Sequence, residues 1–315
     1  MNNIPKLYIV VPCFNEEQVL LITAKIFLEE LQSLINKELI SEDSRILFVD
    51  DGSKDKTWNI IFQLSKENKY FEGIGLSKNR GHQNALLAGL MEVADKCDIA
   101  ASVDCDGQDD ISVIEKMVCE YNNGKDIVYG ARSKRDKDSF FKRFTAENFY
   151  RLLKFMGVDT VYNHADFRLV SAKVLKELSE FKEVNLFLRG IFPFVGFDSS
   201  VVYYERENRI AGNSHYPIFK MLALAVEGIT SFSIQPLRLI LVTGIFISLL
   251  SLIGILWACT MYVKGNVIAG WASLICSIFF IGGIQTIFLG IIGEYLGKIY
   301  LETKHRPRYI INKRT

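Results

Sequence analysis

The sequence has no large excess of charge of either sign. Its 315 residues include 37 lysines and arginines against 36 aspartates and glutamates, which leaves a formal net charge of +1. This balance argues against a general polyanion binder, and we expect no nucleic-acid partner. The charged fraction of 23% is too high for a chain that lies wholly in a membrane. The mean hydropathy of +0.16 is nevertheless higher than we expect for a soluble enzyme, so the average indicates two chemically different parts.

Three short signals are also missing. The N-terminus has no basic segment followed by a small-residue cleavage site, and the apolar run at 7–11 is too short for the core of a signal peptide. The six cysteines show no C-x-x-C spacing, which predicts a reducing compartment and no structural zinc. No G-x-G-x-x-G follows the first predicted strand, which argues against a dinucleotide-dependent oxidoreductase.

Charge is absent from two long stretches of the C-terminal third, Leu239 to Val263 and Gly265 to Gly293. Each exceeds the roughly 20 apolar residues that cross a bilayer. We predict two transmembrane helices within 236–297, at about 237–263 and 267–293. The alternative, a buried hairpin in a soluble domain, is disfavoured by the length of both stretches. Without an internal charge, two spans also offer no polar pathway for a transporter.

Basic residues flank the predicted spans, with Arg238 before the first and six lysines and arginines within 298–315. The positive-inside rule then predicts a multi-pass protein of the inner (cytoplasmic) membrane, with a basic tail and the N-terminal domain in the cytoplasm. The segment 216–235 has apolar residues at helical spacing. It fits an interfacial helix on the membrane and a helix packed on the soluble domain equally well.

Residues 1–215 alternate between short apolar runs and helical patterns. We predict strands at 7–11, 45–49, 74–76, 99–103 and 126–129, with helices at about 18–38, 55–68, 82–95 and 111–122. This alternation predicts an α/β domain with a mostly parallel sheet. Polar or charged residues follow each of the five strands. Because ligands bind at the carboxyl ends of strands in such sheets, we expect one shared pocket there.

Asp104-Cys105-Asp106 follows the fourth predicted strand. In an extended segment residues i and i+2 point to the same side, so both carboxylates, with Gln108 after them, are expected to face one spot. Oxygen ligands of this kind suit Mg²⁺ or Mn²⁺. Asp50 and Asp51 follow the second strand. They fit hydrogen bonding to a nucleoside, and they also fit an ordinary turn with a helix N-cap.

These residues form part of an ordered set of motifs that spans nearly the whole chain. The set consists of Val11-Pro12-Cys13-Phe14-Asn15-Glu16-Glu17, Val49-Asp50-Asp51-Gly52-Ser53, Leu86-Leu87-Ala88-Gly89-Leu90, Asp104-Cys105-Asp106-Gly107-Gln108-Asp109, Gly130-Ala131-Arg132, Ala165-Asp166-Phe167-Arg168-Leu169, Arg209-Ile210-Ala211-Gly212-Asn213-Ser214 and Gly293-Glu294-Tyr295-Leu296-Gly297-Lys298-Ile299-Tyr300. The chain resembles the family-two glycosyltransferases of GT-A (Rossmann-like) fold. Within them it is similar to the polyprenyl-phosphate glycosyltransferases, which include dolichol-phosphate mannose synthase relatives and bactoprenol glucosyltransferases. The last motif is typical of members with a C-terminal membrane hairpin.

The resemblance implies a role for each matching residue. Asp106 and Gln108 would coordinate the metal, and Asp104 would contact the metal or the sugar. Asp166 is the candidate general base, although pairing with Arg168 is an equal alternative. The nucleotide would be held by Pro12, Phe14, Glu16, Asp51 and Arg80. The donor and acceptor phosphates would be held by Arg132, Arg189 and Arg209. The family's usual lysine after Ser214 is replaced by His215, and His82 has no assigned role.

The activity implied is an inverting transfer from a nucleotide-sugar to the phosphate of a membrane polyprenol such as undecaprenyl phosphate, for modification of cell-envelope glycans. A UDP-hexose, carrying glucose or N-acetylglucosamine, is the expected donor. Family members assemble as oligomers, so a homo-oligomer is implied too. Two alternatives are a catalytically idle membrane adaptor that binds nucleotide-sugar, and a relative of the processive polysaccharide synthases. The intact Asp104, Asp106 and Gln108 argue against the first, and the lack of a Q-x-x-R-W motif argues against the second.

Overall fold

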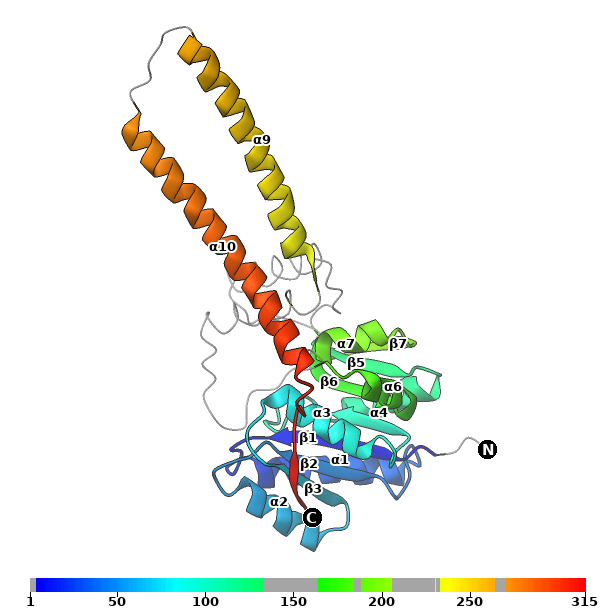
Figure 1. The fold of residues 1–315 in the computed structure, drawn as a ribbon. Helices are drawn as coiled ribbons and strands as arrows, with labels where there is room; N and C mark the ends of the chain where they lie inside the picture. The colour runs from blue at the N-terminus through cyan, green and yellow to red at the C-terminus, as the bar shows by residue number, and fades with distance from the viewer. Residues whose placement is uncertain (1–3, 133–163, 184–187, 206–229, 231–232, 264–269) are drawn as a thin grey trace. The chain divides into compact units, whose positions relative to one another are not determined.

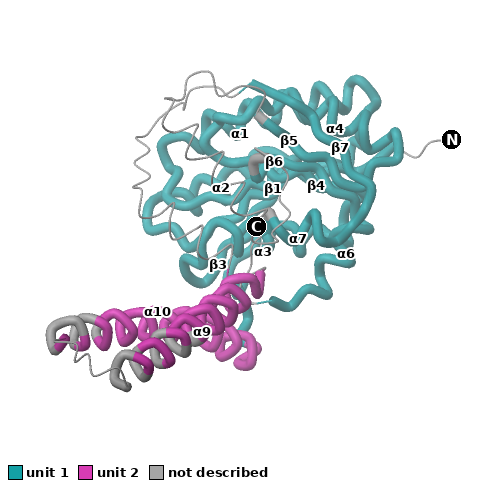
Figure 2. The backbone as a smooth tube through the Cα atoms, turned by 90° about the horizontal axis from the view of Figure 1, so that it is seen from above, with its two compact units in different colours: residues 1–150, 159–217, 306–315 teal, residues 151–158, 218–305 magenta. Residues whose placement is uncertain are grey.

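The computed structural model describes residues 4–132, 164–183, 188–205, 230, 233–263 and 270–315. The chain divides into two compact units (Figure 2). One comprises residues 1–150, 159–217 and 306–315, and we call it the sheet unit. The other comprises residues 151–158 and 218–305, and we call it the helical unit.

The sheet unit is built around one eight-stranded sheet in the order β7-β5-β6-β4-β1-β2-β3-β8 (Figure 1). Its strands are β1 (Leu7–Cys13), β2 (Arg45–Asp50), β3 (Phe71–Leu76), β4 (Ile99–Ser102), β5 (Ile127–Arg132), β6 (His164–Ser171), β7 (Ser199–Tyr204) and β8 (Ile311–Arg314). Strands β1 to β5 and β7 run in one direction, while β6 and β8 run against them. The predicted α/β fold with a mostly parallel sheet is confirmed.

Six described helices accompany this sheet, and four of them coincide with predicted helices. They are α1 (Leu20–Asn36), α2 (Thr57–Glu67), α3 (His82–Val93), α4 (Val113–Asn122), α6 (Ala172–Glu180) and α7 (Leu188–Val195). In α1 the buried residues Leu20, Ala24, Phe27, Leu31 and Leu34 recur every three or four positions, so one face of the helix is apolar. This face packs on one side of the sheet, in a core that also contains residues of α2 and α4.

Helix α3 lies against the opposite face of the sheet, unusually close to it. A Cβ atom at Gly89 would lie 2.4 Å from Cγ1 of Val10 and 2.7 Å from Cγ2 of Val49. The missing side chain therefore lets the helix backbone approach β1 and β2. This close packing fixes the N-terminus of α3 relative to the strand ends, where the candidate site lies.

The helical unit contains α9 (Gln235–Val263, 29 residues) and α10 (Trp271–Thr303, 33 residues). Among the described residues, Phe280–Thr303 is the helical stretch that is long and apolar enough to cross a membrane, by length and composition alone. Helix α10 continues about three turns beyond the predicted end at residue 293. The predicted turn at 264–266 and nearly all of the predicted interfacial helix lie outside the described residues, so the two-span membrane hairpin stays a prediction.

The C-terminal tail returns to the sheet unit. Strand β8 pairs antiparallel with β3, with Ile74 opposite Arg314 and Gly75 opposite Lys313. Beyond the strand, the backbone N–H of Thr315 donates to the carbonyl of Gly73 at 3.0 Å. The sequence pattern suggested only a basic tail here, because four residues with one apolar side chain carry no strand periodicity. The pairing supplies partners for the exposed edge of β3.

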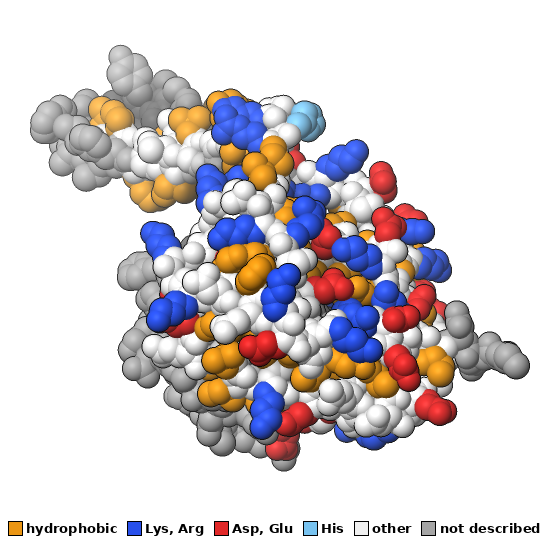
Figure 3. All heavy atoms as spheres, turned by 90° about the horizontal axis from the view of Figure 1, so that it is seen from below, with side chains coloured by type: hydrophobic (Ala, Val, Ile, Leu, Met, Phe, Trp, Pro, Cys, Tyr) orange, Lys and Arg blue, Asp and Glu red, His pale blue; other side chains and the backbone are white. Residues whose placement is uncertain are grey.

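Charge on the described surface is mixed. Figure 3 shows basic and acidic side chains interspersed over the face seen from below. This agrees with the near-zero net charge.

Candidate active site

The carboxyl ends of the parallel strands place several of the predicted site residues in one region. Asp51 follows β2 and Asp104 follows β4. Strand β6 runs antiparallel to β4, with Arg168 opposite Ser102, so the beginning of β6 lies beside the end of β4. This reversal brings Asp166 to Asp104, although 61 positions separate them in the printed sequence.

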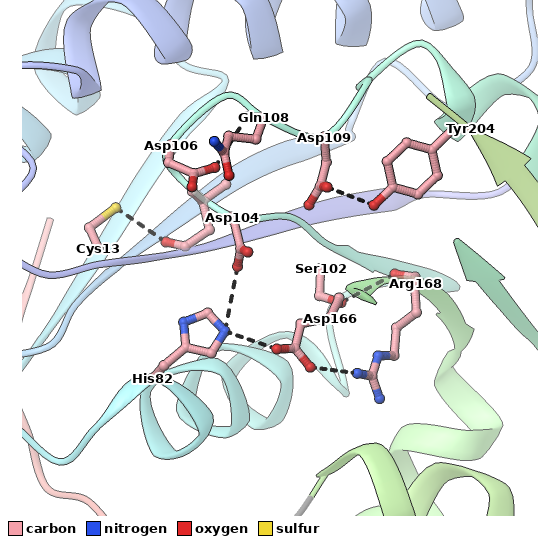
Figure 4. A network of polar contacts seen from close by, with 11 residues as sticks. Cys13, His82, Ser102, Asp104, Asp106, Gln108, Asp109, Asp166, Arg168 and Tyr204 are labelled. Carbon is pink, nitrogen blue, oxygen red and sulfur yellow. Dashed lines mark hydrogen bonds and ion pairs between the residues drawn. The ribbon is translucent and has the colours of Figure 1, made fainter. Parts of the chain in front are cut away.

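Asp104 and Asp166 face the same imidazole (Figure 4). The Nε2 atom of His82, the first residue of α3, lies 3.5 Å from Oδ1 of Asp104 and 3.6 Å from Oδ2 of Asp166. The other oxygen of Asp166 accepts a hydrogen bond from Nη2 of Arg168 at 2.9 Å. Arg168 is 0% exposed and stacks over the ring of Phe192. The predicted alternative for Asp166, pairing with Arg168, is therefore present in the structure.

The predicted metal-binding motif, Asp104 to Gln108, forms a turn and is not extended. Residues 105 and 106 form a turn, and Gly107 has a φ of 66°, which favours glycine. The Asp104 carboxylate points to His82, whereas Oδ1 of Asp106 accepts a hydrogen bond from the backbone N–H of Gln108 at 3.1 Å (Figure 4). The expectation that both carboxylates point to one spot assumed an extended segment, and the turn separates their directions.

Asp51 anchors a neighbouring turn. Its carboxylate is 2% exposed and accepts hydrogen bonds from the backbone N–H groups of Arg80 and Gly81, at 2.7 and 2.9 Å. Gly81 has a φ of 86°, a backbone conformation that disfavours other residues. Within the described part of the chain, Nε of Arg80 is buried without a hydrogen-bond partner. Arg80 can therefore offer a donor to a ligand at this end of the site.

The first strand contributes the other predicted nucleotide residues. Pro12 is buried near the end of β1, while Phe14 is 41% exposed in the loop that follows. The backbone N–H of Glu16 donates to Oγ1 of Thr57 at 2.9 Å, which ties this loop to α2. The exposed Phe14 ring is free of the core and can stack on a planar base.

Burial shifts the pKa of two carboxyl groups of the site, Asp104 and Asp51. It raises the pKa of Asp104 to about 6, with His82 opposing the rise and Asp166 adding to it. It also raises the pKa of Asp51, against the two backbone hydrogen bonds that favour the ionised form. Repulsion among clustered carboxylates disfavours their ionised forms, and a bound cation relieves it.

The glycosyl transferase family 2 model matches residues 8–179. Over 308 residues the chain is 50% identical to "Uncharacterized glycosyltransferase YkoT" of Bacillus subtilis, which covers 98% of this chain and 91% of that protein. It is 40% identical over 311 residues to "Bactoprenol glucosyl transferase" of Shigella phage SfX, covering 98% and 99%. It is 39% identical over 310 residues to "Prophage bactoprenol glucosyl transferase homolog" of Escherichia coli, covering 98% and 99%. The chain belongs to glycosyl transferase family 2. The resemblance drawn from the motifs is confirmed.

Of the three predicted phosphate-binding residues of this glycosyltransferase, two are described by their backbone alone and one lies outside the described residues. Arg132 is the last residue of β5 and Arg189 is the second residue of α7, but their side chains lie outside the description. Arg209 and His215 both fall in 206–229, outside the described residues. The assignment of Arg132, Arg189 and Arg209 as phosphate-binding residues stays a prediction.

The donor set suits a divalent cation that also binds substrate. Asp104, Asp106 and Gln108 offer oxygen ligands, which Mg²⁺ and Mn²⁺ prefer. Among the described residues, no three side chains of His, Cys, Asp or Glu form a metal-holding group of their own. Mg²⁺ ordinarily uses one or two carboxylates and completes its shell with substrate phosphates and water, so these residues fit a metal that arrives with the nucleotide.

Sequence reasoning missed three residues of this site: His82, Asp109 and Tyr204. Arg168 was named, but only as an alternative partner of Asp166. Asp109 is 6% exposed and accepts a hydrogen bond of 2.6 Å from the hydroxyl of Tyr204, at the end of β7. The motif around Asp109 was a usable signal, but no sequence spacing connects it to Tyr204, because the pairing of β7 with β5 brings them together.

Proposed function

We propose that this glycosyltransferase moves a hexose from a UDP-hexose to the phosphate of a membrane polyprenol such as undecaprenyl phosphate, with inversion at the anomeric carbon. The observation that carries the proposal is the 40% identity to a bactoprenol glucosyl transferase over 98% of this chain. Because the match includes α9 and α10, it covers both the sheet unit and the apolar helices. Glucose is the proposed sugar, with N-acetylglucosamine as the alternative.

We propose that different residues of the site bind the nucleotide, the diphosphate and the sugar of the donor. Pro12, Phe14, Glu16, Asp51 and Arg80 lie on or beside the ends of β1, β2 and β3, and they are proposed to hold the nucleotide. Asp106 and Gln108 are proposed to hold the metal at the diphosphate. Asp104 lies beside His82, which also faces Asp166, and this position supports the proposal that Asp104 contacts the sugar. When bound, Mg²⁺ or Mn²⁺ supplies charge compensation to the departing diphosphate.

The reaction needs little proton transfer. An oxygen of the acceptor phosphate attacks the anomeric carbon, a new carbon–oxygen bond forms, and the bond to UDP breaks with the electron pair leaving on the diphosphate. The acceptor is an anion near neutral pH, so positioning matters more than deprotonation. Both oxygens of Asp166 already face cationic or N–H groups, at 2.9 and 3.6 Å. We therefore propose that Asp166 orients the site and does not act as a base.

The acceptor explains the proposed membrane location. Its lipid tail stays in the bilayer, so the site must work at the membrane surface. We propose that α9 and α10 form a two-span hairpin that holds the sheet unit on the cytoplasmic side of the inner membrane, with Arg238 and the basic tail on that side. Arg132, Arg189 and Arg209 are proposed to bind donor and acceptor phosphates. A homo-oligomer remains part of the proposal.

Membranes that contain the protein, labelled UDP-sugars and added undecaprenyl phosphate test this function. We expect one labelled lipid product with UDP-glucose, sensitive to mild acid and absent when EDTA is present. Membranes with Asp106→Asn are the matched control. Absence of lipid product with every donor would overturn the proposal, and UDP-sugar binding without product would instead support the idle adaptor.

A further inference from the structure

The turn between β3 and α3, residues 77–81, connects the two ends of the candidate site. At one end its backbone N–H groups at Arg80 and Gly81 bind the Asp51 carboxylate, at 2.7 and 2.9 Å. Directly after the turn, His82 points its imidazole between Asp104 and Asp166 (Figure 4). Three consecutive residues thus join the proposed nucleoside end to the proposed sugar end.

We propose that His82 is a positioning residue for the donor sugar. Its imidazole bridges Asp104 and Asp166 and holds these two carboxylates in the orientation that receives the sugar hydroxyls. The inference rests on the proposed function for the identity of the donor. It assigns His82 to the sugar and not to the nucleoside or the metal.

The position of His82 between Asp104 and Asp166 follows from which carboxylate oxygen faces which cationic or N–H group. Arg168 takes Oδ1 of Asp166, and His82 faces Oδ2 of the same side chain. Asp104 presents its Oδ1 to the same nitrogen at 3.5 Å. Both His82 distances exceed a normal hydrogen bond, so Nε2 lies midway between two acceptors and is not committed to one. Without this group, two neighbouring carboxylates would repel each other and change their orientation.

The imidazole is carried by a rigid support. Helix α3 is held against β1 and β2 by the close approach at Gly89, and the two residues that precede the helix, Arg80 and Gly81, are held by hydrogen bonds to Asp51. A site group on such an element keeps its geometry better than one on a loop. The His82 side chain is 43% exposed, so part of its surface is accessible to a ligand.

This arrangement predicts an effect on the sugar part of the donor only. Sites that hydrogen-bond substrate hydroxyls discriminate strongly between sugars, because unsatisfied polar groups are costly. The nucleoside contacts depend on Asp51 and the turn backbone, which a change at the His82 side chain leaves in place. Sugar placement and nucleoside affinity should therefore separate when His82 is altered.

The test compares His82→Phe with His82→Gln in the full-length, detergent-solubilised protein. Phenylalanine keeps a ring of similar size without an N–H, while glutamine keeps a neutral N–H donor at similar reach. For His82→Phe we expect kcat to fall by about 100-fold, as for a misplaced reactant. We expect its Kd for UDP to stay within about twofold and its affinity for UDP-glucose relative to UDP to fall by about tenfold. For His82→Gln we expect values within about fivefold of the unaltered protein.

Three results would overturn the proposal: an unchanged kcat in His82→Phe, an equal loss in His82→Gln, or a loss of UDP affinity that parallels the loss of kcat. The last would show that the nucleoside end had collapsed. Failure of the proposed function is separable, because the unaltered protein would then form no lipid product. In that case the binding measurements decide, and an unchanged ratio of UDP-glucose to UDP affinity in His82→Phe overturns the role of His82.

Discussion

The pair formed by Arg168 and Asp166 makes a quantitative prediction about the stability of the sheet unit. At 2.9 Å, with an effective dielectric constant of about 20, the gross attraction is about 6 kcal/mol. Bringing the two charges out of water costs several kcal/mol for each, so the intact pair adds little beyond a well-packed apolar pair. Breaking it is different, because one charge is then left without its partner.

We expect Arg168→Met to lower the free energy of unfolding by about 3 kcal/mol. This is the lower end of the range for broken buried pairs, because Asp166 keeps 14% exposure and His82 remains 3.6 Å away. Asp166→Leu should cost at least as much, since Arg168 is 0% exposed. The double variant should be more stable than either single variant, with a coupling energy of about 3 kcal/mol.

Urea unfolding in detergent, followed by Trp58 fluorescence, measures these values. Trp58 lies in α2 of the sheet unit, and replacing Trp257 and Trp271 with phenylalanine removes the other tryptophan signals of the chain. Additive losses in the double variant, or a loss below about 1 kcal/mol in Arg168→Met, would refute the reasoning. Either result would mean that the two charges do not depend on one another.

Four further predictions concern the site and its support. Asp106→Ala should abolish transfer while the unfolding midpoint stays unchanged, and transfer at the normal rate would remove the metal argument. Because burial raises the pKa of Asp104 to about 6, and Asp104 is proposed to face the sugar in its ionised form, binding of UDP-glucose in the presence of Mn²⁺ should weaken as the pH falls from 7 to 5. Asp104→Asn should flatten this dependence, and a flat profile in the unaltered protein would contradict it. Gly89→Ala should destabilise the protein by about 2 kcal/mol in urea unfolding, because overpacking outweighs the gain in helix propensity; a gain in stability would disprove the close packing of α3. Deleting residues 311–315 should lower the unfolding midpoint and increase light scattering on heating, because it uncovers the edge of β3, and an unchanged midpoint would show that β8 adds no stability.

Much of the fold could be predicted because local patterns coincide with buried strands and amphipathic helices. β1, β2 and β4 are apolar throughout or nearly so, as strands covered on both faces must be. The strands β6, β7 and β8 were not predicted. Strand β8 shows the reason. It pairs with β3, which lies some 230 residues earlier in the chain, and its own side chains do not favour a strand.

The acidic residues of the candidate site could be predicted from the sequence, but most of their contacts could not. Asp51, Asp104 and Asp166 could be named from motifs, since each follows or begins a short apolar run. Arg168, two positions from Asp166, was named as an alternative partner. The contacts of His82 could not be named, because contacts between residues far apart in the sequence depend on strand order. His82 reaches Asp166 from α3, and Arg168 reaches it from within β6. Both contacts lie where the beginning of β6 pairs antiparallel with the end of β4.

Four properties of the protein follow from the amino-acid sequence alone: the family, the α/β class, the two uncharged C-terminal stretches and the identity of the acidic motif residues. Each of these depends on neighbouring residues or on an ordered set of motifs, which a linear chain displays directly. Three further features are visible only in the folded protein: the metal motif turns at Gly107, Asp166 pairs with Arg168, and His82 lies between two carboxylates. These features depend on backbone conformation and on distant segments that the pairing of β4 with β6 brings together, and burial there makes each charge depend on its neighbours.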